Sequence, residues 1–444
     1  MGNIFILKHM RIKVLIAIVF LSLQLHAADY YLSPSGSDVT GSGTFASPYF
    51  TLEKAWTVIS AGDTVYMRGG TYLYPETQVL TGENGTAGNL INVWNYPGEV
   101  PIISKAETFT WYSLTAGVYF IGDYFHWKGI SVTGFEQETN SVYFGFFGQN
   151  FSYCTFENMK VYGNGYGFYC KEDEGTLTGN LWYNCDFYKN YDPLTVAPGA
   201  YGNADGLAVG AVANFTSVNT VRCCRFYHNS DDGIDLWNNS GIVYIDSCWA
   251  FHNGYREDLT THGGDGNGFK LGDMVSSVEM HRKKLTNNVA CYNYDQGFSQ
   301  NTYNDQLNAC ILYNNIAYQN GNSTSYPYTF GSARVGFVVN IFKNNIAYDN
   351  WGDRTVVKEI PDISINNSWD ISYTITDNDF VSVDSAGITG SRINGRLPDL
   401  DFLKLSSTSG LIDAGTEVGI KFYGNKPDLG PYEYVTPGNF MRVR

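Results

Sequence analysis

The sequence predicts an all-β protein built as a parallel β-helix, because two patterns recur along it in step. In the first, an aromatic residue stands two positions before an asparagine, at intervals of 24 to 40 residues. Its asparagines are Asn164, Asn190, Asn229, Asn253, Asn320 and Asn350, with a weaker copy at Asn293. In the second, glycine is followed by an apolar residue. One coil of a parallel β-helix takes roughly this many residues.

A repeated coil cannot bury its own apolar face, so coils stack and share one core. The 43% apolar content suffices for a long core, and 34 Tyr and 48 Gly suit strands joined by tight turns. Asparagines at matched corners are expected to hydrogen-bond along the stack in a ladder. A β-sandwich with Asn-rich loops is the alternative, although sandwiches lack a fixed period near this length.

The first 28 residues read as a secretory signal peptide. Lys8, Arg11 and Lys13 precede an apolar run over residues 14–25, and Ala27 and Ala28 end it. The run is short for a membrane-spanning helix. We therefore expect a secreted or periplasmic protein that is not held in a membrane.

Residues 29–444 are expected to form a single β-helix domain. Residues 29–70 would make an N-terminal cap, with strands over 30–33 and 64–67 and a short amphipathic capping helix over 51–60. Such a helix would shield the open end of the core, as terminal repeats must. From about residue 352 the repeat fades, which predicts an irregular C-terminal tail over 352–444.

The eight cysteines of an exported chain invite a disulfide interpretation. However, Cys185, Cys224 and Cys248 each lie five residues before a repeated asparagine, where later coils carry Asn288, Asn315 and Asn345. This spacing favours one inward-facing column of free, buried thiols. A Cys224–Cys248 bridge between neighbouring coils is the open alternative.

Three segments, residues 203–209, 230–237 and 266–272, look like one strand used three times. Aligned on Gly206, Gly233 and Gly268, they alternate apolar and polar residues, the period of a half-buried strand. If they stack as neighbours, Asp205, Asp232 and Asn267 form one column, and Ala208, Asp235 and Lys270 form the next.

Four aspartates would then converge, because Asp231 lies at the bend before Asp232. Carboxylates without Cys or His suit a hard cation, and calcium before magnesium because phosphate motifs are lacking. Lys270 would sit beside Asp235. It is either an ion-pair partner or a base that removes the proton next to a uronate carboxylate, so that β-elimination follows.

The three segments, with residues 30–38 and 61–65, resemble polysaccharide lyase family 9, a family of right-handed parallel β-helices. The resemblance implies that Asp205, Asp231, Asp232 and Asp235 bind Ca²⁺ and that Lys270 is the catalytic base. It further implies cleavage of a 4-linked galacturonate in pectin, in either homogalacturonan or rhamnogalacturonan I.

The substrate prediction leans to rhamnogalacturonan I. Its alternation of acid and deoxy sugar needs fewer basic subsites than homogalacturonan, and the central coils carry few basic residues but many aromatics, including Tyr166, Tyr169, Trp237 and Tyr294. Residues 282–284, Arg-Lys-Lys, are expected in a solvated turn rather than on substrate.

Two other function classes stay open at this point. A polygalacturonase-type hydrolase would use aspartates as acid and base, but it would leave Lys270 without a role. A non-catalytic β-helix would bind glycan without cleaving it. The net charge of −15 argues against nucleic acid as a partner. We expect a monomer acting on an acidic pectic polysaccharide.

Overall fold

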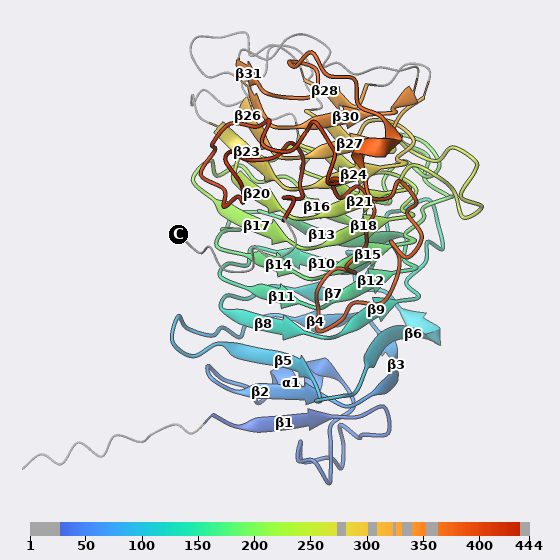
Figure 1. Ribbon diagram of the computed structural model, residues 1–444. Helices are drawn as coiled ribbons and strands as arrows, with labels where there is room; N and C mark the ends of the chain where they lie inside the picture. Colours follow the sequence, from blue (N-terminus) through green and yellow to red (C-terminus); the bar gives the residue numbers. More distant parts are fainter. Residues whose placement is uncertain are drawn as a thin grey trace, which may run out of the picture.

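The computed structural model describes residues 27–272, 281–300, 309–322, 326–330, 340–351 and 363–435. Short parallel strands stack into three sheets that run along the molecule (Figure 1). The first sheet contains, in stacking order, β1 (Asp29–Leu32), β2 (Thr64–Met67), β5 (Ile91–Asn95), β8 (Phe125–Lys128), β11 (Thr155–Glu157), β14 (Leu181–Tyr183), β17 (Val218–Arg222), β20 (Ile242–Asp246), β23 (His281–Thr286), β26 (Ala309–Tyr313), β29 (Ile341–Lys343) and β31 (Ile363–Ile365).

The other two sheets are built in the same way. The second contains β4 (Gln78–Leu80), β7 (Ala116–Phe120), β10 (Phe144–Gln149), β13 (Tyr166–Lys171), β16 (Leu207–Val209), β19 (Ile234–Asp235), β22 (Phe269–Lys270), β25 (Phe298–Ser299) and β28 (Tyr328–Thr329). The third contains β3 (Gly70–Glu76), β6 (Pro101–Thr110), β9 (Ser131–Thr133), β12 (Lys160–Tyr162), β15 (Asp186–Tyr188), β18 (Arg225–Tyr227), β21 (Trp249–Phe251), β24 (Val289–Cys291), β27 (Ile316–Tyr318) and β30 (Ile346–Tyr348).

A regular coil contributes one strand to each sheet, as β11, β12 and β13 do. Each of these strands pairs in parallel with the strand one coil further on. This arrangement confirms the predicted parallel β-helix.

The N-terminal end contains a short helix, α1 (Leu52–Trp56), where a longer one was predicted over 51–60. The Thr51 side chain begins it by accepting a hydrogen bond from the Lys54 N–H. Trp56 is buried and stacks on Phe125 at 5.4 Å between ring centroids. That this helix caps the core stays a prediction, and the predicted signal peptide lies almost wholly outside the described residues.

The predicted asparagine ladder is confirmed. Asn229 Nδ2 donates to Asn253 Oδ1 of the next coil at 3.0 Å and also to the Phe187 carbonyl of the preceding coil at 3.2 Å. The same side-chain bond links every neighbouring pair in the series Asn164, Asn190, Asn229, Asn253, Asn293, Asn320 and Asn350. The buried amides therefore hold successive coils in register.

The glycine repeat keeps step with this ladder because glycine is the residue that fits beside it. A Cβ on Gly233 would stand 2.5 Å from the Gly268 carbonyl oxygen and 2.9 Å from Asn253 Nδ2. A Cβ on Gly206 would meet the Gly233 carbonyl oxygen at 2.7 Å. Any side chain here would push neighbouring coils apart.

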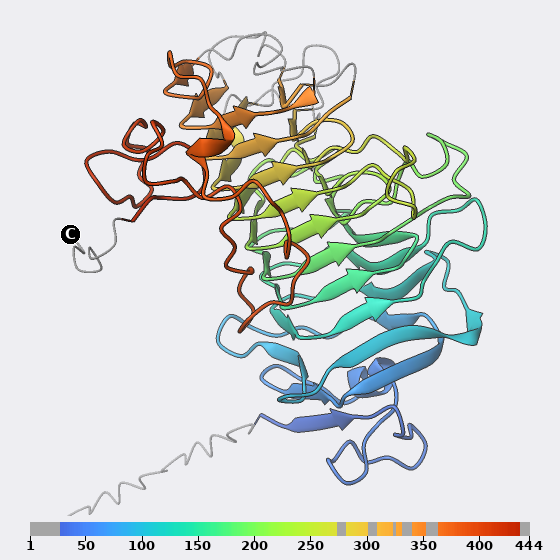
Figure 2. The ribbon, with the colours of Figure 1, turned by 45° about the vertical axis from the view of Figure 1, so that its right-hand side comes forward.

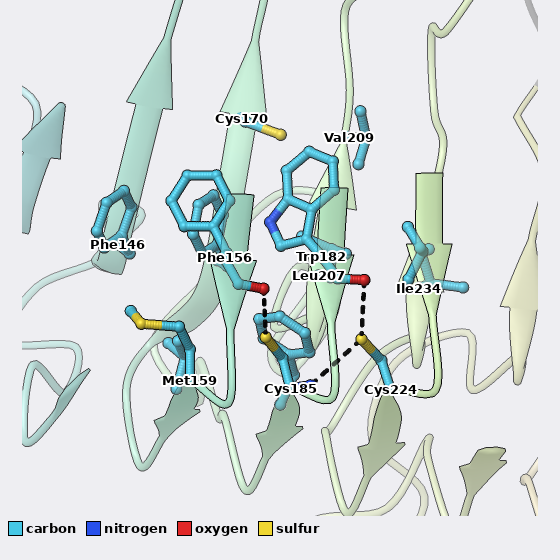
Figure 3. Packing of buried hydrophobic residues seen from close by; sticks show 14 of the residues in the cluster. Phe146, Phe156, Met159, Cys170, Trp182, Cys185, Leu207, Val209, Cys224 and Ile234 are labelled. Atoms are coloured by element: carbon cyan, nitrogen blue, oxygen red, sulfur yellow. Dashed lines mark hydrogen bonds between the residues drawn. The ribbon is translucent and has the colours of Figure 1, made fainter. Parts of the chain in front are cut away.

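The predicted cysteine column is also confirmed (Figure 3). The Cys185 N–H donates to Cys224 Sγ, and the Cys224 N–H donates to Cys248 Sγ, both at 3.4 Å. One coil later the Cys248 N–H donates to Asn288 Oδ1 at 2.8 Å, so asparagine takes over the same position. All eight cysteines are free thiols in the structure.

The expected solvated turn at residues 282–284 is wrong, because these residues lie in β23. Lys283 is buried, and its ammonium donates to the Asn239 carbonyl at 2.9 Å and the Gly241 carbonyl at 2.5 Å. The charge is matched by carbonyl oxygens at the corner of the preceding coil.

Within the described parts of the chain, no helix is long and apolar enough to cross a membrane.

The C-terminal segment, residues 363–435, first adds β31 to the first sheet and then follows the outside of the third sheet (Figure 2). Phe402 and Leu405, together with a single 3-10 turn, η2 (Asp377–Asp379), belong to this outer layer, whose apolar side chains bury Phe251 and Tyr318.

A buried ion-pair network attaches this layer to the helix. Asp186 binds Arg225 of the next coil and Arg392 of the C-terminal segment, each at 2.8 Å. Burial alone would raise the pKa of Asp186, but the hydrogen bonds and charges of the two guanidinium groups outweigh it and lower the pKa.

Asp186→Ala should lower the free energy of unfolding by about 3–5 kcal/mol, because it leaves two buried guanidinium groups unpaired. Since the pKa is lowered in the folded state, this contribution is present above about pH 4 and is lost as the pH falls through the folded pKa. Denaturant titrations at pH 7 and pH 3 measure the difference. Asp399→Ala, which breaks the exposed pair with Lys404, is the control and should cost under about 1 kcal/mol. Equal losses in both variants would contradict the account.

Candidate functional site

The three predicted strands are neighbours in the second sheet as β16, β19 and β22. Ala208 pairs with Asp235, and Asp235 pairs with Lys270, so these residues share one column as the sequence predicted. The other predicted column forms just before the strands. The Asp232 N–H donates to Asp205 Oδ1 at 2.9 Å, and the Asn267 N–H donates to Asp232 Oδ1 at 2.7 Å.

Lys270 is enclosed by acids. Its Nζ lies 2.9 Å from Asp232 Oδ2, 3.4 Å from Asp235 Oδ2 and 3.0 Å from Asp265 Oδ2. Lys270 is only 8% exposed. The structure therefore brings the lysine and the predicted aspartates into one cluster on one face.

The four predicted aspartates are buried and oppose one another's ionisation. Burial raises the pKa of Asp205 well above its usual value, and the charges of Asp231, Asp235 and Asp232 raise it further. Burial likewise raises the pKa of Asp235 to about 6, although the Lys270 charge works in the other direction. These carboxyl groups therefore need positive charge beyond that of Lys270 to ionise together.

Lys270 responds to the same field in the opposite sense. Burial disfavours its charged form, but the charges of Asp232, Asp235, Asp231 and Asp265 outweigh burial and raise its pKa well above the usual value. Without a cation the acids thus keep this amine protonated.

The donor set fits a hard divalent cation. Carboxylate oxygens of Asp205, Asp232 and Asp235 lie within 4.8 Å of one another, and so do those of Asp231, Asp232 and Asp265. Two oxygens that each lie about 2.4 Å from a calcium ion fall within this separation. Among the described residues, one buried oxygen at the cluster, Asn267 Oδ1, accepts no hydrogen bond, whereas Asp232 Oδ2 has the Lys270 ammonium 2.9 Å away. Calcium is therefore compatible with the site.

Asp265 and the Tyr166 hydroxyl are parts of the cluster that sequence reasoning missed. Asp265 ends the loop before β22, its side chain is 65% exposed, and its N–H donates to Asp231 Oδ1 at 2.5 Å. The buried Tyr166 hydroxyl donates to Asp205 Oδ2. An acid five residues before Lys270 was the available signal for Asp265.

The cluster opens into a pocket of about 480 Å³ on the outside of the second sheet. It is lined by the aromatic side chains of Phe144, Tyr169 and Trp237 together with Lys270 and four aspartates. A groove that combines apolar walls with a few convergent polar groups is the usual form of a ligand site.

Comparison with known proteins agrees with this geometry. The family model described as "Pel9A-like, right handed beta helix region" matches residues 30–350. The chain belongs to this family. The match supports the right-handed helix, the assignment to polysaccharide lyase family 9 and the lyase class of the enzyme.

Individual relatives are similar along most of their length. Pectate lyase L of Dickeya chrysanthemi is 34% identical over 415 residues, which cover 91% of this chain and 90% of the relative. Pectate lyase PEL9 of Emericella nidulans is 31% identical over 395 residues, with 82% and 89% covered.

Two solved structures superpose well. Pectate lyase Pel9A gives a TM-score of 0.73 at 29% identity and covers 91% of this chain and 96% of that structure. A rhamnogalacturonan lyase gives a TM-score of 0.70 at 27% identity, with 86% and 97% covered.

Asp205→Asn should stabilise the protein when a chelator is present. A carboxyl whose pKa is raised on folding destabilises the folded state as the pH rises above about 3.9, whereas the amide cannot ionise. The melting temperature of the variant should match that of the wild type near pH 4 and exceed it by about 2 °C at pH 8. The control Asp173→Asn changes an exposed carboxylate and should show no such pH-dependent gain. Lower melting temperatures for Asp205→Asn at both pH values would contradict the electrostatic account.

Proposed function

We propose that the protein is a calcium-dependent polysaccharide lyase of pectin that cleaves the bond to O4 of a galacturonate by β-elimination, with Lys270 as the base. The observation that carries the proposal is the position of the Lys270 amine within 3.4 Å of three carboxylates, on the lining of a surface pocket. The family relationship supports the reaction class.

Asp205, Asp231, Asp232 and Asp235 would hold the ion. Bound Ca²⁺ would supply positive charge that offsets the acids facing Lys270 and withdraws electrons from the uronate carboxylate, which acidifies the neighbouring C5–H. Tyr166 and the backbone N–H groups of Asp232 and Trp237 orient these carboxylates.

Lys270, in its neutral form, takes the proton from C5. The C5–H electrons form the C4=C5 double bond, the C4–O bond breaks, and the leaving oxygen takes up a proton from water. Asp265 holds the ammonium at 3.0 Å, so it positions the amine between Asp232 and the open pocket. The product carries an unsaturated uronide at its new end.

The favoured substrate is rhamnogalacturonan I. Among the described residues that line the pocket, Lys270 carries the one positive charge, while four aspartates, Asp205, Asp231, Asp235 and Asp265, line the same space. A single galacturonate is matched by this arrangement, but a run of adjacent uronates would meet like charge. Homogalacturonan is the second candidate, because several relatives are pectate lyases.

Lys270→Ala should lower kcat by about 10²- to 10⁴-fold, the usual contribution of a positioned base. The assay follows the ultraviolet absorbance of unsaturated ends released from rhamnogalacturonan I and homogalacturonan in parallel. Lys128→Ala, on the first sheet and paired with Glu157, should retain wild-type turnover. Full activity in Lys270→Ala would remove the lysine from the mechanism, and product from homogalacturonan alone would overturn the favoured substrate.

Calcium should raise the melting temperature, because an ion bound only to the folded state stabilises it by about 2.7 kcal/mol at 100 times its dissociation constant. Asp231→Asn and Asp235→Asn should lose most of this stabilisation, and chelator should abolish activity. Calorimetry with and without Ca²⁺ measures the calcium-induced rise in melting temperature. Asp413→Asn, in the C-terminal segment, is the control and should keep this rise. An unchanged wild-type melting temperature in millimolar Ca²⁺ would argue against the ion site.

A further inference from the structure

Trp237 stands at the edge of the candidate site with half of its surface exposed. It lies in the turn that follows β19, two residues beyond Asp235. The backbone N–H of Trp237 donates to Asp235 Oδ1 at 2.7 Å, and the residue lines the same pocket as Asp235 and Lys270. The indole is 50% exposed.

The two neighbours of Trp237 along the stack are glycines. On the preceding coil, the Cβ position of Gly210 lies 3.4 Å from the Trp237 carbonyl oxygen, to which the Ala211 N–H donates at 3.1 Å. On the next coil, Gly272 lies against the Leu236 carbonyl, directly before Trp237. Gly272 has φ +79°, and a Cβ there would stand 2.0 Å from the Leu236 carbonyl oxygen, which excludes a side chain.

Neither glycine carries a side chain that could cover the indole. The aromatic rings two and three coils earlier stack on one another instead, as Tyr169 and Phe147 do at 5.4 Å between ring centroids. Within the described residues, no ring stacks on Trp237 and no side chain hydrogen-bonds to its indole. An apolar face of this size beside a charged pocket favours a ligand that is apolar on one side and polar on the other.

We infer that Trp237 binds the sugar next to the reacting galacturonate and selects a deoxyhexose at that subsite. This inference rests on the proposed function and deepens it, because it names the residue that distinguishes the two pectic polymers. A deoxyhexose places a methyl group and an apolar ring face on the indole. A second uronate would place its carboxylate beside Asp235 and Asp265.

The test measures binding apart from turnover. Oligosaccharides of rhamnogalacturonan I are titrated calorimetrically, with Ca²⁺ present, into Lys270→Ala and into the double variants that add Trp237→Ala or Trp237→Phe. Trp237→Ala should weaken binding about tenfold, as expected for losing the burial of one large apolar side chain, and Trp237→Phe should restore most of it. Tyr244→Ala, at a 41% exposed aromatic on the first sheet, should have no effect.

Matched measurements exclude a merely structural role. With Lys270 intact, Trp237→Ala should raise KM on rhamnogalacturonan I about tenfold with kcat nearly unchanged, and the calcium-induced rise in melting temperature should persist. A fall in kcat with unchanged KM, or loss of the calcium effect, would show that the variant disturbs Asp235 and would overturn the inference. Homogalacturonan fragments serve as the second ligand, and equal weakening for both polymers would overturn the selectivity.

Failure of the proposed function would look different. In that case the wild type would release no unsaturated product from rhamnogalacturonan I, whatever the effect of Trp237. Failure of the inference alone would leave wild-type cleavage intact and give the same dissociation constant with and without the indole.

Discussion

Register between neighbouring coils is the constraint on which the rest of this structure depends. The asparagine ladder fixes it from inside, because the buried amides bond from coil to coil and, as Asn229 does, to a carbonyl of the preceding coil. A slip of one residue would turn Asp235 to the core and leave Lys270 facing solvent without its partner. The glycines beside the ladder keep the coils close enough for this register to hold, so local backbone requirements and the site geometry come from the same repeat.

Rigid register also explains how like charges stay together. Separate loops could relieve the repulsion between Asp205, Asp231 and Asp232 by moving apart, but strands locked in a stack cannot. The resulting cost is carried by the rest of the solenoid, whose core and ladders extend well beyond the three coils of the site. A cation bound there, as proposed, would gain affinity from ligands that are already assembled, since little ordering remains to oppose binding.

The sequence was sufficient for the parts that the repeat governs. It placed Asp205, Asp232, Asp235 and Lys270 together because their spacing from the repeated glycines sets their coil and face. The sequence did not predict Asp265, since the path of an inserted loop depends on contacts that do not follow the repeat. Lys283 was misplaced because three successive basic residues resemble a turn, whereas its carbonyl partners lie more than 40 residues away. The attachment of Arg392 to Asp186 spans 206 residues and likewise leaves no local signal.

In a solenoid of similar coils, a single site requires that some coils carry different side chains from the others. Here these differences lie in one outward-facing column of the second sheet. Read along the stack, the column runs Tyr119, Phe147, Tyr169, Ala208, Asp235, Lys270, Ser299 and Thr329. The three aromatic rings stack on one another and cover that part of the sheet. The small Ala208 ends the stack and leaves room for the pocket. An acid and a base follow on the next two coils. Under the proposed function, this change from aromatic ring to methyl group to charged group sets where the polymer is cut, while the backbone repeat stays the same.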